Sequence, residues 1–338
     1  RIRQVLHLRR RHPTRGARRN LWLTVQDDRA QHAFEIFDLA LSVRFQRAPL
    51  LDAHRTDPFA MPKKSSSVYE TVNAWETVWG DGVVPTWLAG MTIGFVLLFP
   101  LLKMMFPKTI KKHGAFLLAF EIVAFFPLFY CAYEGATAWW FKLDDFTTKE
   151  QRLYATSPHA RNVLQCNFAF QTWDFFASML HKETAAPEML AHHLLAALLC
   201  YWAITMPYMH YYGVYFMGVA EVSSVPLVVV DICKYYPEVT KRFPWLDLAS
   251  KLSFGILFLI VRDILWVWTA ITVWKDGLGI LKAGDFPEQY PGYITAGVLL
   301  ANVFFTTLQL LWTKKLWDGV VELLDGGKKE EEKGKKKR

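Results

Sequence analysis

The sequence predicts an all-α protein that crosses a membrane several times. Hydrophobic residues make up 52% of the 338 residues and charged residues only 21%, and the mean hydropathy is positive, at +0.13. This composition excludes a disordered chain and a disulfide-rich secreted scaffold. Seven stretches have the length, about 20 mostly apolar residues, that a helix needs to cross a bilayer. We therefore expect a multi-pass membrane protein with about seven transmembrane helices.

The seven predicted spans follow one another between residues 83 and 312. The third is the weakest, because Gln165, Asn167, Gln171 and Asp174 interrupt it, and such groups must face other helices or a cavity rather than lipid. The predicted spans are residues 83–106, 114–140, 163–180, 189–206, 208–230, 252–274 and 293–312.

Basic residues gather in alternate connections and so predict the orientation in the membrane. The first and fifth connections and the C-terminal tail are rich in Lys and Arg, whereas the second and sixth mix both signs. Basic connections stay in the cytosol, so the N-terminus of the bundle, residues 61–82, is expected in the lumen and the charged tail, 319–338, in the cytosol. The last four residues include Lys335 and Lys336, which resemble a dilysine retrieval signal of the endoplasmic reticulum. The alternative is a solvated charge run.

The first 60 residues differ in composition from the rest of the chain. They hold twelve Arg, no Lys and six acids, a charge of 12 − 6 = +6 out of the total of +8. We expect residues 1–60 to be an Arg-rich leader that is disordered or an artefact of the gene model; a transit peptide is the alternative, although its acids argue against it. The remainder carries only +2 and has no obvious basic face, so we expect no nucleic-acid partner.

Neither cysteines nor histidines form a metal-binding pattern. Cys131, Cys166, Cys200 and Cys233 lie without a CxxC pair and are expected to be small buried residues. Only one pair of adjacent histidines occurs after the leader, and zinc needs three or four converging ligands. We expect no metal and no cofactor.

Ionisable residues within the predicted spans are costly and are therefore candidates for function. We expect Arg262 to pair with Asp174, Glu221 or Asp263. His192 and His193 open the fourth span, where they could bond backbone carbonyls; alternatively, one of them could act as a base or nucleophile with Asp174 fixing its tautomer. Asn302 and Gln309 add polar groups to the seventh span.

Several marks in fixed order carry a resemblance to a known family. They are Trp173-Asp174-Phe175, Met189-Leu190-Ala191-His192-His193, Glu221-Val222-Ser223-Ser224-Val225-Pro226, Phe258-Leu259-Ile260-Val261-Arg262 and Trp312-Thr313-Lys314-Lys315. The chain resembles the TLC-domain family, which includes the ceramide synthases. The resemblance implies a TLC domain over residues 107–318, with six helices around a central cavity, preceded by one more helix over 83–106.

The resemblance also frames the functional expectations. In ceramide synthases the histidine pair, here His192-His193, and a later His-Asp pair serve acyl transfer from acyl-CoA to a sphingoid base. The later pair is replaced here by Ala220-Glu221-Val222-Ser223, which resembles the branch that does not make ceramide.

Three hypotheses follow. The first is a protein of lipid homeostasis that binds or senses membrane lipid through Glu221, Ser223, Ser224, Arg262 and Asn302. The second is an N-acyltransferase that uses His192, His193 and Asp174, with acyl-CoA as co-substrate and ceramide as the sphingolipid product. The third is a lipid transporter or scaffold. Membrane lipids are the expected partners, a homo- or hetero-oligomer is possible, and the endoplasmic reticulum is the expected location.

Overall fold

The computed structural model describes residues 74–284, 286–287, 290 and 292–336, with side chains up to residue 321. All of them belong to one compact unit, Thr56–Arg338. The predicted leader, 1–60, and the start of the predicted lumenal segment lie outside the described residues.

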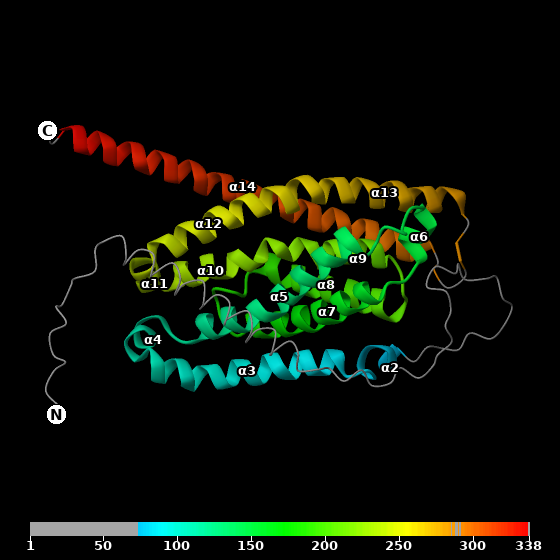
Figure 1. Ribbon diagram of the computed structural model, residues 1–338, viewed down its shortest axis with the longest axis horizontal. Helices are drawn as coiled ribbons and strands as arrows, with labels where there is room; N and C mark the ends of the chain where they lie inside the picture. Colours follow the sequence, from blue (N-terminus) through cyan, green and yellow to red (C-terminus); the bar gives the residue numbers. More distant parts are fainter. Residues whose placement is uncertain (1–73, 285, 288–289, 291, 337–338) are drawn as a thin grey trace, which may run out of the picture. The chain divides into compact units, whose positions relative to one another are not determined.

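The described part of the chain is built from helices and short connections and contains no strand (Figure 1). Pro107, Pro158, Pro187, Pro237 and Pro244 each open a helix, where the missing N–H breaks no intrahelical bond. In chain order the elements are α2 (Ala74–Trp79), α3 (Val83–Met105), α4 (Pro107–His113), α5 (Phe116–Phe141), α6 (Lys149–Tyr154), α7 (Pro158–Ser178), α8 (Pro187–Thr205), α9 (His210–Met217), η1 (Val219–Val222), α10 (Ser224–Tyr235), α11 (Pro237–Arg242), α12 (Pro244–Phe258), η2 (Leu259–Leu265), α13 (Trp266–Ala283) and α14 (Gly292–Lys336).

Six helical segments in the described residues are long and apolar enough to cross a membrane. They are α3, α5, α8, α9 to α10, α12 to α13, and α14 up to Val321, and they match six of the seven predicted spans. The third predicted span is α7, which has 21 residues but does not meet the apolar criterion. Its Gln165, Asn167, Gln171 and Asp174 are buried, because α7 packs against α3, α5, α8 and α9. Neighbouring helices therefore replace lipid around α7.

The fifth and sixth predicted spans differ in detail from uniform helices. The stretch predicted at 208–230 consists of α9, the 3₁₀ turn η1 and α10, and the stretch predicted at 252–274 is part of a longer segment, Pro244–Ala283, with the π-helix η2 at its centre. The break at η1 lies where α5 crosses very closely: a Cβ added to Gly135 would lie 2.5 Å from the Cα of Gly218. Only glycine permits this approach.

Aromatic and charged contacts join alternate connections at the two ends of the bundle. At one end Tyr290 stacks on Tyr208 and Tyr154, with ring centroids 5.2 and 5.4 Å apart, and the Tyr154 and Tyr208 rings are tilted with centroids 5.7 Å apart. At the other end, where Figure 1 shows α4 and α11, Lys112 Nζ donates to Glu238 Oε1 at 2.9 Å. Successive long helices therefore alternate in direction, as the charge pattern predicts; which end faces the cytosol stays a prediction.

The outer surface of the bundle is apolar. Leu97, Leu300 and Leu310 are each more than 60% exposed, as expected for side chains that face lipid tails. The four cysteines are free and buried, as predicted. All-α, multi-pass architecture is thus confirmed.

Candidate functional site

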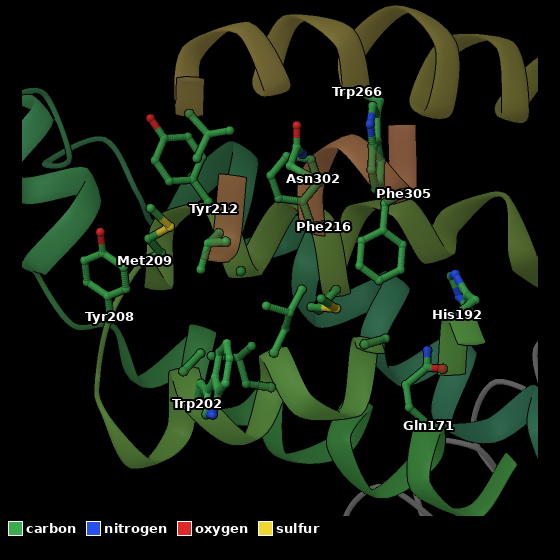
Figure 2. Close-up of a pocket in the computed structure, with 18 of the residues that line it drawn as sticks. Gln171, His192, Trp202, Tyr208, Met209, Tyr212, Phe216, Trp266, Asn302 and Phe305 are labelled. Atoms are coloured by element: carbon green, nitrogen blue, oxygen red, sulfur yellow. The ribbon is translucent and has the colours of Figure 1, made fainter. Parts of the chain in front are cut away.

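Two cavities lie inside the bundle and meet at its centre. The apolar cavity, of about 90 Å³, lies among α7, α8, α9, α13 and α14 (Figure 2). The polar cavity, of about 580 Å³, is lined by residues of α5, α7, α8, α10, α12 and α14. Gln171, His192, Glu221 and Arg262 line both. The interior is therefore a slot that changes from apolar to polar at these four side chains.

The apolar cavity runs away from the central polar residues. Figure 2 shows Gln171 and His192 at one end and Tyr208 and Met209 at the other. Between them the walls are formed by alkyl and aromatic groups, including Phe216 and Phe305. An acyl chain is the kind of group that such a wall accommodates.

Arg262 is the centre of the polar network. Its Nε donates to Ser223 Oγ at 2.8 Å, and its Nη2 donates to Ser224 Oγ at 2.9 Å and lies 3.4 Å from Glu221 Oε2. Ser224 Oγ in turn donates to Glu221 Oε2 at 2.6 Å. Of the three partners that the sequence left open, the structure selects Glu221; Asp263 instead accepts from Thr313 Oγ1 at 2.6 Å.

Local backbone irregularities present this network to the cavities. Arg262 lies within the π-helix η2, a type of element that is frequent at functional sites. The carbonyl of its neighbour Val261 accepts from the Tyr215 hydroxyl at 2.6 Å. Glu221 lies in the 3₁₀ turn η1, and Ser223 follows it directly. The tighter turn η1 and the wider π-helix η2 therefore bring Glu221, Ser223 and Arg262 together.

Asp174 contacts the second histidine of the pair and not the first. His193 Nε2 lies 3.4 Å from Asp174 Oδ1, and His193 Nδ1 lies 2.7 Å from Gln171 Oε1. The Ser178 hydroxyl also donates to Asp174 Oδ1, at 2.7 Å. Both ring nitrogens of His193 are therefore engaged by protein groups.

His192 has a different environment. Its ring meets Phe305 and Trp312 edge-on, with centroids 5.3 and 5.5 Å apart. Its Nδ1 is buried and has no hydrogen-bond partner among the residues that the structure describes. His192 thus reaches both cavities without a carboxylate to hold its tautomer.

The remaining predicted lipid-contacting residue, Asn302, lines the apolar cavity. Its Oδ1 accepts from Trp274 Nε1 at 3.1 Å. All eight predicted site residues therefore line one or both cavities. Among them, Asp174 contacts His193, the rings of His192 and His193 meet edge-on, and Arg262, Glu221 and the two serines form one network.

Sequence reasoning missed three acids of the polar cavity, one of which, Glu183, is exposed. Glu121 of α5 and Asp231 of α10 both line it, with Lys234 and Lys315 at its more exposed part. Glu121 could have been found, since it is an ionisable residue inside a predicted span. Asp231 lies one residue past the predicted end of its span. Within the described residues no three His, Cys, Asp or Glu side chains are grouped to hold a metal ion.

Comparison with known families gives one match. A family model described as the TLC domain matches residues 113–318, which is more than half of the chain. No curated protein and no solved structure matches the chain.

Proposed function

The chain belongs to the TLC-domain family of integral membrane proteins, and from this premise we propose that it binds a membrane lipid inside its helical bundle. The match confirms the predicted family and does not separate its branches. Lipid homeostasis, through binding or sensing of the lipid, is the role that this proposal assigns.

One observation carries the proposal: an apolar cavity and a polar cavity meet at Gln171, His192, Glu221 and Arg262. A membrane lipid has the same division, with an alkyl chain at one end and a polar headgroup at the other. The alkyl chain comes from the bilayer and not from water, so the apolar cavity holds it through close van der Waals packing rather than through the hydrophobic effect. The polar groups at the junction would fix the position of the headgroup.

The experiment fills the apolar cavity. Ala203 of α8 lines it, so Ala203→Phe should exclude the alkyl chain. Leu198→Phe is the matched control, because Leu198 lies on the same helix, is 44% exposed and does not line either cavity. Each protein is purified in detergent, and its retained lipid is measured by native mass spectrometry. Wild type and Leu198→Phe should retain lipid and folded Ala203→Phe should lose it; equal retention by all three would overturn the proposal.

The charge pattern of the sequence supports a proposal for the location. We propose residence in the endoplasmic reticulum with a cytosolic C-terminus, on the basis of the basic connections and Lys335 and Lys336. Changing both lysines to Ser should release a fluorescently tagged protein to later compartments. Unchanged retention would contradict the signal.

Acyl transfer is the second candidate function, and His192 favours it, because it lines both cavities and neither of its ring nitrogens bonds a described residue. A general base needs a ring nitrogen that is free to take a proton from the substrate, whereas both nitrogens of His193 are occupied by Gln171 and Asp174. Purified protein in nanodiscs would receive acyl-CoA and a sphingoid base. Ceramide formation that His193→Ala and His192→Ala abolish would support an N-acyltransferase, and no product from folded wild type would exclude it.

A further inference from the structure

Two carboxyl groups in the polar cavity form no ion pair with any described residue. Glu121 is only 8% exposed, and Asp231 is half-buried. In the part of the chain that the structure describes, neither carboxyl makes a hydrogen bond or an ion pair. Burying a carboxylate without a partner is costly, so this pair is an unsatisfied feature of the cavity.

The other acids that line the cavity have partners. Glu221 is paired with Arg262, and Asp174 accepts from Ser178 and contacts His193. Glu183 is exposed, and its Oε1 lies 3.9 Å from Lys182 Nζ. The electrostatic neighbours of the Glu121 carboxyl are Asp231 and Asp174, which repel it, and Lys234, which attracts it. Lys234 is exposed, and among the described side chains its Nζ forms no ion pair with either acid. Burial and the two acids Asp231 and Asp174 disfavour the ionised form of Glu121, and a cation bound next to Glu121 and Asp231 would offset both effects, so a cationic ligand fits this part of the cavity.

The order of groups along the slot indicates what carries that cation. The apolar cavity comes first, the Arg262 guanidinium lies at the junction, and Glu121 and Asp231 line the polar cavity beyond it. Ser224 and Asp231 are seven residues apart on α10, about 10 Å along the helix axis and on the same face. Arg262 Nη1 makes no hydrogen bond to any of the described residues and is a donor for an anionic oxygen.

We propose that the polar cavity selects an amine-bearing phospholipid headgroup, with the ammonium group bound by Glu121 and Asp231 and the phosphate by Arg262. In such a lipid the alkyl tail is followed by the phosphate and then by the amine. In the protein the apolar wall is followed by the guanidinium and then by the carboxylates, so the two orders match. This inference rests on the proposed lipid-binding function and names its substrate class.

The test measures headgroup preference. The full chain is placed in nanodiscs with equal amounts of phosphatidylethanolamine and phosphatidylglycerol that carry the same acyl chains. After extraction into detergent, the two lipids retained by the protein are counted by native mass spectrometry. A charge-assisted hydrogen bond of about 1.5–3 kcal/mol predicts a preference for the amine lipid of about tenfold or more.

The variants locate that preference. Glu121→Gln should bring the ratio close to one, because it removes a carboxylate that binds the ammonium group, and Asp231→Asn gives the same expectation should Glu121→Gln fail to fold. Glu134→Gln is the matched control: it lies on the same helix but pairs with His159 and lines neither cavity. It should keep the wild-type ratio.

Each other result overturns a defined part of the reasoning. Retained lipid without an amine preference in wild type, or a preference that survives in both acid variants, overturns this inference and leaves lipid binding intact. A long-chain amine without phosphate that displaces phosphatidylethanolamine at equal concentration overturns the assignment to a phospholipid. The absence of any retained lipid overturns both this inference and the proposed function.

Discussion

The Arg262–Glu221 pair allows the sharpest test of how this bundle is held together. Replacing Arg262 with Met removes one ion pair and two hydrogen bonds to serines and leaves the Glu221 carboxylate without its counter-ion. Both side chains are 9% exposed, so solvent screens the pair little. Breaking a buried pair on one side costs about 3–5 kcal/mol, and Glu221→Gln should cost a similar amount because it strands the guanidinium.

The double variant distinguishes this account from simple loss of packing. The double variant Arg262→Met with Glu221→Gln leaves no stranded charge. It should therefore lose much less free energy of unfolding than the two single variants lose when their losses are added. A coupling of about 1–3 kcal/mol is expected for residues in direct contact.

The assay is equilibrium unfolding in mixed detergent micelles, followed by circular dichroism, with Lys314→Met as the control. Lys314 pairs with Asp318 on the exposed surface of α14, where a salt bridge contributes about 0–1 kcal/mol. Additive losses in the double variant would refute the reasoning, because they would show that the two charges do not depend on each other.

Two further predictions test the crossing of α5 with η1 and the contact between α4 and α11. Gly135→Ala should destabilise the fold by about 3 kcal/mol or more in the same unfolding assay, because its Cβ would overlap the backbone at Gly218; Gly90→Ala, in open space on α3, should not, and equal effects would contradict the close crossing. The Lys112 ammonium lowers the pKa of Glu238 from 4.5 to about 2. Since the folded-state pKa lies below the unfolded value, the contribution of Glu238 to stability is fully present above pH 4.5 and is lost as the pH falls toward 2. The stability difference between wild type and Glu238→Gln should therefore shrink over that range, and a difference independent of pH would argue against the contact.

The sequence alone determined the class of the fold. Spans of about 20 apolar residues can be satisfied in lipid only as helices or closed barrels, and continuous apolar runs without strand-like alternation favour helices. The local sequence also determines where five helices begin, because each begins at a proline, whose missing N–H breaks no intrahelical hydrogen bond there. The order of the motifs gave the family, which the match over residues 113–318 confirms.

The sequence predicted that the polar groups of the third span face other helices or a cavity, but it could not say which helices surround them. Hydropathy alone leaves α7 ambiguous, and only its packing against α3, α5, α8 and α9 explains why Gln171 and Asp174 are tolerated there. A hydropathy pattern counts residues, whereas tolerance of a polar group depends on what surrounds it.

Tertiary structure alone decided which polar groups meet. The sequence left three possible partners for Arg262 and two histidines for Asp174, and the structure pairs Arg262 with Glu221 and Asp174 with His193. The physical reason is that spacing fixes which face of one helix a side chain occupies, while the rotation and irregular turns of the neighbouring helices fix what lies opposite. Here the 3₁₀ turn η1 and the π-helix η2 determine which side chains of the neighbouring helices face each other, and the pattern of apolar residues predicts neither element.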